Sequence, residues 1–399
     1  MRLKKISILS ILLVFLLPNL AKAETLFLDN NAISNFSDVN THLVVSEFNT
    51  GKIISKRGEN KQVSVSNLPN HLALFLLTDD LKNNKISLDT KINITNSDAI
   101  LNKYNLSSSV SVEDALFLLE NEDSAALLEA IFTKYDLTIE KAKDILSSMS
   151  LNDTTLASLT IDEKNMSTAK NMSYLTNMIL RNYPKLTEIT KNPEVTLSSG
   201  SKATNNVSFT ESDKFRVLGL NHANKNSITF AYSGDTKLLI TILNQNDDKA
   251  TYFDKLQKTY DYLFTNYSYK LALKAGSYKI NNENITFEKD IYDLFYEKHS
   301  IKDVTYLLMN KKILLFQKYE TISANAGTVF ADFSSNDTSG VLAKVKTNFI
   351  NDINFDKKDN LEKTTIVIDR TKYFATGILA IYSLVFMAFY IMKKVVRKD

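Results

Sequence analysis

The sequence predicts a mixed α/β fold of the α+β kind. Within the stretch 63–85, residues 68–77 end in a dense apolar run, 72–77, which predicts a helix apolar on nearly all sides in the middle of a domain. Residues 41–56 read as two strands around the turn Asn49-Thr50-Gly51. Residues 227–232 and 237–243 alternate or run apolar like two further strands. Helices and strands should therefore share one core.

Length and composition allow one large core or two. The chain has 399 residues, of which 44% are hydrophobic and 23% charged, and its net charge is +3. This small charge, without a basic patch in the body, does not favour nucleic acid as a partner. Cysteine is absent, which excludes disulfides, thiolate metal sites and cysteine nucleophiles. No metal site and no cofactor is predicted, because the four histidines lack metal-ligand spacing: His42, His71, His222 and His299.

The N-terminus reads as a secretory signal. Residues 1–5 are basic, residues 6–17 are apolar, and Ala21-Lys22-Ala23 is a small-x-small cleavage site. We expect cleavage after Ala23; the alternative is an uncut second anchor.

The C-terminus reads as a membrane anchor. Residues 373–392 carry no charge, and at ~1.5 Å per residue they span a ~30 Å hydrocarbon core. Lys393-Lys394 and Arg397-Lys398 follow, which predicts a cytoplasmic C-terminus and a body outside the inner membrane. A buried core helix, the alternative, fits this length and terminal position less well.

We therefore expect four segments. They are a signal peptide (1–23), a mixed α/β domain (24–270), a β-rich domain (271–370) and an anchor with a short basic tail (371–399). The β-rich domain is predicted as a small sandwich from short β-branched and aromatic runs at 278–280, 285–287, 304–308, 312–316, 341–345 and 364–368.

The order of these segments resembles the D-alanyl-D-alanine carboxypeptidases, the low-molecular-mass penicillin-binding proteins. In that family a strand pair leads to Ser-x-x-Lys at the start of a buried helix, as 41–56 and 68–77 are placed here. The closest local match is 166–175, which leads to a helix ending near Tyr183-Pro184. Over about 25–270 the chain resembles the family in the order and spacing of its segments. The β-rich domain resembles the family only in its general type. It implies a β-lactamase/transpeptidase-like antiparallel sheet flanked by helices, here with a C-terminal β-sandwich domain and one transmembrane helix.

All three motifs of that family are altered in this chain. Asn67 and Asn70 stand where the nucleophilic Ser and the Lys should be. In the Ser-x-Asn motif, the match on Asp123 and Ala125 puts Glu120 and Glu122 at the Ser and Asn positions. In the Lys-Thr-Gly motif, Gly219-Leu220 precede the replacements. We call the seven replaced residues the motif positions: Asn67, Asn70, Glu120, Glu122, Asn221, His222 and Ala223.

These replacements remove the chemistry of acyl transfer. That reaction needs a hydroxyl nucleophile and a neighbouring base, and neither Asn67 nor Asn70 can act as one. Glu120 and Glu122 would face the pocket that receives an anionic peptide end, and like charges ~4 Å apart repel by on the order of 4 kcal/mol at an effective dielectric of 20. We therefore expect no catalytic residue, no hydrolysis and no tight penicillin capture.

Other residues are weaker candidates. Ser64 or Ser66 could act with a shifted register, but neither has a Lys three residues later. Ser-x-x-Lys also occurs at 167–170, where Ser is expected to cap a helix, and at 199–202, in a loop. A new metal or acid–base site at Glu120, Glu122 and Asp123 is the remaining alternative; acidic loops are more often solvated.

The sequence thus predicts a pseudoenzyme of the cell envelope. It would be anchored in the bacterial inner membrane by its C-terminal span, with a periplasmic body that acts as a scaffold or binds an envelope protein or peptidoglycan. One alternative is a divergent, active serine-type D-Ala-D-Ala carboxypeptidase in peptidoglycan maturation. Another is a structural subunit of an envelope complex.

Overall fold

The computed structural model describes two compact units, each taken here by itself. The first comprises Leu28–Lys270 and Asp293–His299, and the second comprises Leu271–Tyr292 and residues from Ser300 onward. The described residues are 29–49, 53–190, 194–205, 216–223, 225–280, 283–287, 290–298, 304–309, 312–317, 328–332 and 345–348.

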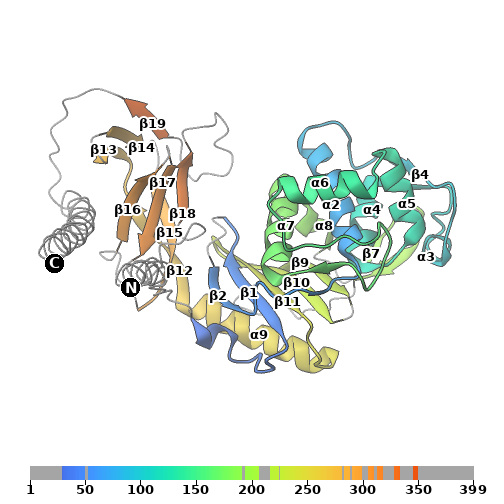
Figure 1. Cartoon of the computed structure of the whole chain (residues 1–399), viewed down its shortest axis with the longest axis horizontal. Coiled ribbons are helices and arrows are strands. Elements are labelled where there is room, and N and C mark those ends of the chain that lie inside the picture. The colour runs from blue at the N-terminus through green and yellow to red at the C-terminus, as the bar shows by residue number, and fades with distance from the viewer. Residues whose placement is uncertain are drawn as a thin grey trace, which may run out of the picture. The chain divides into compact units, whose positions relative to one another are not determined.

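A five-stranded antiparallel sheet forms the centre of the first unit (Figure 1). Its order is β2-β1-β11-β10-β9, so β2 and β9 are its edges. The predicted strand pair at 41–56 supplies β1 and β2, and the runs at 227–232 and 237–243 supply β10 and β11. The bounds are β1 (His42–Glu47), β2 (Ile53–Arg57), β9 (Arg216–Ala223), β10 (Asn226–Ser233) and β11 (Thr236–Leu243).

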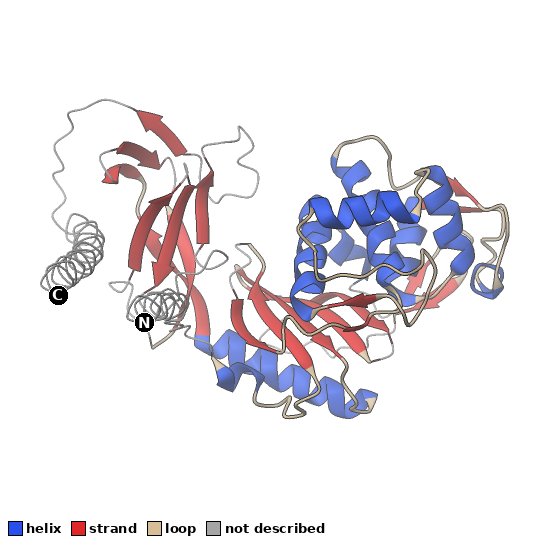
Figure 2. Ribbon diagram, viewed as in Figure 1, coloured by secondary structure: helices blue, strands red, loops and turns tan. Residues whose placement is uncertain are grey.

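Helices cover both faces of this sheet (Figure 2). Successive residues of β1 point to opposite faces, so Val44 belongs to one core cluster while Leu43 and Val45 belong to the other. One face carries α9, and the other carries a group of helices around α2. The helices are η1 (Asn30–Ile33), α2 (Leu68–Lys82), α3 (Ala99–Lys103), α4 (Val112–Asn121), α5 (Ala125–Lys134), α6 (Ile139–Ser148), α7 (Ala169–Asn182), α8 (Leu186–Thr190) and α9 (Lys249–Asn266).

The predicted central helix is α2, which packs against α4, α5 and α7. Asn67 occupies its N-cap position and Pro69 its first turn, where a missing N–H costs no hydrogen bond. The side chain of Asn67 makes no capping hydrogen bond, however. Ser111 does cap α4, where its hydroxyl accepts a hydrogen bond from the backbone N–H of Asp114 at 3.1 Å.

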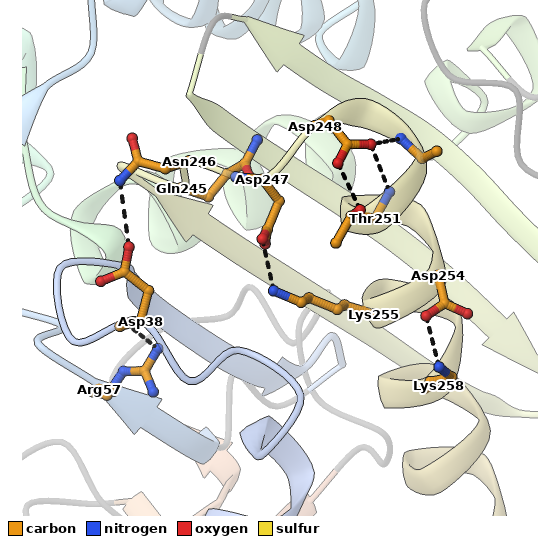
Figure 3. Close-up of polar contacts among 11 residues, drawn as sticks. Asp38, Arg57, Gln245, Asn246, Asp247, Asp248, Thr251, Asp254, Lys255 and Lys258 are labelled. Carbon is orange, nitrogen blue, oxygen red and sulfur yellow. Dashed lines mark hydrogen bonds and ion pairs between the residues drawn. The ribbon is translucent and has the colours of Figure 1, made fainter.

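The start of helix α9 is capped by an aspartate (Figure 3). The carboxylate of Asp248 accepts hydrogen bonds from the backbone N–H groups of Ala250 and Thr251 at 3.1 and 3.0 Å. Lys255 forms an ion pair with Asp247 at 2.7 Å, which holds the preceding loop against the helix. The buried side chains of α9 that cover the sheet are Tyr252, Leu256, Thr259, Tyr260 and Leu263.

Four two-stranded ladders are also described; three lie in the first unit, and the strands of the fourth, β12 and β15, each have residues in both units. They pair β3 with β6, β4 with β5, β7 with β8, and β12 with β15. Their bounds are β3 (Val63–Ser64), β6 (Met166–Ser167), β4 (Lys91–Asn93), β5 (Ser109–Ser111), β7 (Glu194–Thr196), β8 (Lys202–Thr204), β12 (Tyr267–Leu273) and β15 (Ile291–Tyr296).

The second unit is rich in strands, and its described strands form two three-stranded sheets, β13-β14-β19 and β16-β17-β18. A sandwich packing of these sheets stays a prediction. The predicted strand at 364–368 and residues 341–344 of the predicted strand at 341–345 lie outside the described residues, and β18 was not predicted. The bounds are β13 (Gly276–Ile280), β14 (Glu283–Phe287), β16 (Val304–Met309), β17 (Lys312–Gln317), β18 (Thr328–Asp332) and β19 (Val345–Asn348).

The predicted signal peptide (1–23) and membrane span (373–392) also lie outside the described residues. Among the residues that are described, no helix combines the length and the apolar character needed to cross a membrane.

Candidate functional site

Asn70 ties the start of α2 to the loop between α4 and α5. Its side-chain amide is only 2% exposed and donates hydrogen bonds to the carbonyl oxygens of Leu119 at 3.0 Å and Glu122 at 3.2 Å. The carboxylate of Asp123 lies 3.5 Å from the same nitrogen. The first two altered motifs are therefore adjacent in space, and a structural amide joins them.

The orientation of the Asn70 carboxamide follows from these acceptors. Three oxygen atoms surround its nitrogen, whereas its own buried oxygen has no hydrogen-bond partner among the described residues. Leaving one buried acceptor unpaired costs about 1–3 kcal/mol. The hydrogen bonds that the amide nitrogen donates to two backbone carbonyl oxygens offset this cost.

His71 follows Asn70 and is buried in the same turn. Burial lowers its pKa from 6.5 to about 4, so the ring is neutral at pH 7. Its Nδ1 lies 3.3 Å from the backbone oxygen of Asn67, and a neutral ring that carries its proton on Nδ1 can donate to that oxygen. The sequence predicted no role for His71, since a lone histidine in an apolar run carries no signal of its own.

The negative charge of Glu122 is stabilised by two neighbouring side chains that the sequence did not predict. Its carboxylate accepts hydrogen bonds from Lys103 Nζ at 3.1 Å and from the Tyr104 hydroxyl at 2.5 Å. The pKa of Tyr104 is raised by burial and by this bond, so the phenol stays a donor. These two contacts weaken the repulsion expected between Glu122 and an anionic peptide end, and whether Glu120 and Glu122 face such a ligand stays a prediction.

Of the other two acidic residues, Asp123 lies in the α4–α5 loop, whereas Glu120 lies in the last turn of α4 and not in a loop as expected. The pKa of Asp123 is raised, first by the loss of hydration and then by the nearby Glu122. Glu120 is half-buried. Among the described residues, no group of three or more His, Cys, Asp or Glu side chains is arranged to hold a metal ion, so the loop does not form the alternative metal site.

The third altered motif lies on β9, an edge of the central sheet. His222 is paired with Ser227 and Asn221 with Ile228 on β10. Asn226, the first residue of β10, donates through its side-chain amide to the backbone oxygen of Ser64 at 2.9 Å. Because Ser64 ends β3 and lies three residues before Asn67, the β9–β10 hairpin adjoins the segment that leads into α2.

Two of the other serine candidates, Ser64 and Ser199, donate hydrogen bonds to oxygen acceptors. The hydroxyl of Ser64 donates to the carboxylate of Glu163. Ser199 donates to the backbone oxygen of Tyr104 at 2.6 Å, while Lys202 pairs with Glu194.

In the Ser-x-x-Lys sequence at 167–170, the serine hydroxyl contacts another hydroxyl. Ser167 ends β6 and shares a hydrogen bond with the hydroxyl of Thr154 at 2.9 Å. The prediction that Ser167 caps the following helix was wrong, because Thr168 is the cap of α7.

A comparison with protein-family models identifies the family of this fold. The model for D-alanyl-D-alanine carboxypeptidases matches residues 31–247, which is more than half of the 399 residues. The chain belongs to this family. The family prediction made from the sequence is confirmed, as is the mixed α/β transpeptidase-like fold. A search of curated protein sequences found no significant match.

Solved structures of D-alanyl-D-alanine carboxypeptidases and related penicillin-binding proteins share this fold at low identity. Penicillin-binding protein 6B of Escherichia coli has 15% identity and a TM-score of 0.55, and the match covers 71% of this chain and 92% of that one. PBP3 of Streptococcus pneumoniae, described as a peptidoglycan synthesis regulatory factor, has 17% identity and a TM-score of 0.55, with coverages of 73% and 96%. The carboxypeptidase DacD of Francisella tularensis has 12% identity and a TM-score of 0.52, with coverages of 75% and 92%.

In this member of the carboxypeptidase family, the expected motif positions fall on or near three elements that follow one another along the chain. These elements are the start of α2, the α4–α5 loop and the edge strand β9. Of the seven motif positions, the structure links Asn70 directly to the α4–α5 loop, and it places Asn221, His222 and Ala223 together on β9.

Proposed function

We propose that this chain is a non-catalytic member of the D-alanyl-D-alanine carboxypeptidase family that serves the cell envelope as a binding or scaffold protein. The observation that carries the proposal is the state of Asn67 and Asn70. Both are buried amides, and Asn70 is engaged by the carbonyl groups of Leu119 and Glu122.

The functional groups at the motif positions support the proposal. A carboxamide is not a nucleophile at neutral pH and cannot accept the proton of a serine hydroxyl. Loss of the nucleophile or of its base typically costs about 10⁴ to 10⁶ in turnover. Here the positions of both are occupied by amides, and the hydroxyl candidates Ser64 and Ser199 donate their hydrogen bonds to oxygen acceptors.

The proposed place of action follows from the two ends of the sequence. A cleaved signal at 1–23 and an uncharged run at 373–392 followed by basic residues support a periplasmic body with one span in the inner membrane. A test is protease treatment of spheroplasts: the body should be digested while a short C-terminal tag is protected. Protection of the body would contradict this topology.

Labelling with fluorescent penicillin distinguishes an inactive member of the family from a divergent, active peptidase. The full chain in detergent should give no covalent label under conditions that label an active family member stoichiometrically. Stoichiometric labelling would overturn the proposal. Ser64→Ala and Ser66→Ala variants would then show whether either of these serines had become the nucleophile.

The partner class needs a separate experiment. Purified peptidoglycan sacculi and a crosslinked, detergent-solubilised membrane fraction can each be tested for retention of the tagged full chain. Retention by sacculi supports a wall-binding role, and a stoichiometric co-purifying protein supports a scaffold role. If neither retains the chain, the proposed binding function is wrong even though the protein is inactive.

A further inference from the structure

A pocket on the helical side of the first unit lies apart from the motif positions. It has a volume of about 420 Å³ and is bounded by the first turns of α4, by α8 and by β7 with the loop that follows it. Asp114, on its α4 wall, precedes Glu122 by eight residues, which corresponds to about 12 Å along a helix. The pocket and the acidic loop are therefore at opposite ends of α4.

The wall of the pocket is held in place by a buried carboxylate. Asp114 is 5% exposed, and its oxygens accept hydrogen bonds from the backbone N–H of Ser198 at 3.1 and 3.2 Å and from the Ser198 hydroxyl at 2.5 Å. This fixes the loop after β7 against α4. A wall that is ordered before binding lowers the entropy cost of binding.

Five of the twelve residues that line the pocket are apolar. Phe117 and Leu197 are buried core residues that reach the pocket, and three half-buried side chains complete the apolar part: Leu88, Ile189 and Val195. Ligand pockets typically combine such an apolar lining with a few placed polar groups, in volumes of about 300–1,000 Å³.

Three exposed charged side chains also line the pocket: Glu113, Lys185 and Glu188, of which Glu188 has a partner of its own. The carboxylate of Glu113 and the ammonium group of Lys185 are both exposed, and neither has a hydrogen-bond or ion-pair partner among the described residues. Tyr183 also lines the pocket, and burial and the Glu113 carboxylate raise its pKa, so its hydroxyl remains a donor at neutral pH.

We propose that this pocket binds a small zwitterion with an apolar body, of the free amino-acid or dipeptide class. Glu113 pairs with the ligand's ammonium group, and Lys185 and the Tyr183 hydroxyl bind its carboxylate. The apolar side chain of the ligand packs against Phe117 and Leu197. This proposal does not depend on whether the motif positions are catalytically inactive.

Calorimetric titration of the full chain in detergent tests the proposal with leucyl-leucine as the probe. Both the L,L and the D,D dipeptides are titrated, because the pocket has no known stereochemical preference. We expect saturable binding of at least one of them, and at least a tenfold loss of affinity for the N-acetylated, C-amidated form. The absence of binding at 10 mM, or equal affinity of the free and capped dipeptides, would overturn the proposal.

Variants at the rim and wall provide the second test. Glu113→Gln and Lys185→Met should each weaken binding at least fivefold, and Thr196→Trp, on the exposed wall of β7, should block it. The matched controls Glu140→Gln and Lys143→Met change exposed residues of α6 outside the pocket and should leave affinity unchanged. Equal affinity in the rim variants and the controls would refute the site, whatever the penicillin assay shows.

Discussion

The side-chain amide of Asn70 donates a 3.0 Å hydrogen bond to the backbone oxygen of Leu119, at the end of α4. At the position where the family's catalytic lysine is expected, this chain therefore has a structural tie between two helices. The same amide donates to Glu122, so a single side chain satisfies two carbonyl groups where the α4–α5 loop begins.

Replacing Asn70 with Leu should destabilise the first unit. The variant leaves two carbonyl oxygens without their donor, and we expect a loss of about 1–3 kcal/mol in the free energy of unfolding. Urea unfolding of the full chain, followed by circular dichroism, measures this change. Asn152→Ala, at an exposed position, is the control and should change stability by less than about 0.5 kcal/mol. Equal stability of the two variants would show that the tie contributes nothing.

Tyr104→Phe should also be destabilising, because it removes the hydroxyl that donates to the Glu122 carboxylate. A hydrogen bond to a charged group contributes about 1.5–3 kcal/mol. The ion pair of Glu122 with Lys103 is more exposed and should contribute less, so Lys103→Met should cost under about 1 kcal/mol. Tyr174→Phe, on an exposed face of α7, is the matched control. A larger effect for Lys103→Met than for Tyr104→Phe would contradict this ranking.

These two contacts illustrate how far the sequence could predict the structure. The run at 68–77 predicted α2 because a helix apolar on all sides must be buried. The partners of Glu122 could not be predicted, since Lys103 and Tyr104 lie 19 and 18 residues away and meet it only through tertiary packing. Asn67 has the composition of a cap and occupies the cap position, but its side chain does not cap the helix.

His71 predicts a specific dependence of stability on pH. Its pKa is lowered by burial from 6.5 to about 4, so the unfolded chain binds more protons than the folded chain between these values. The contribution of the neutral ring is present above pH 6.5 and is lost as the pH falls toward 4. Between pH 7 and pH 5 the loss should be about 2 kcal/mol.

The His71→Leu variant isolates this contribution, since leucine does not titrate. The difference in unfolding free energy between wild type and variant should change by about 2 kcal/mol between pH 7 and pH 5, in the direction that favours the variant at pH 5. A difference that stays constant with pH would mean that the ring is not buried in its neutral form.

Asp248→Ala should destabilise α9 by about 1 kcal/mol, because the carboxylate caps two backbone N–H groups. Asp254→Ala on the same helix removes only an exposed ion pair with Lys258 and should cost less. Thermal unfolding of both variants gives the comparison. Equal shifts in the midpoint of thermal unfolding would show that the Asp248 cap stabilises the protein no more than the exposed ion pair does.

The most direct test of the central claim is the intact mass of the full chain after incubation with excess benzylpenicillin. If the amides at the motif positions have replaced the acylation chemistry, the mass will be unchanged while an active carboxypeptidase of the family gains one penicilloyl group. A stoichiometric adduct on any serine of this chain would contradict the claim.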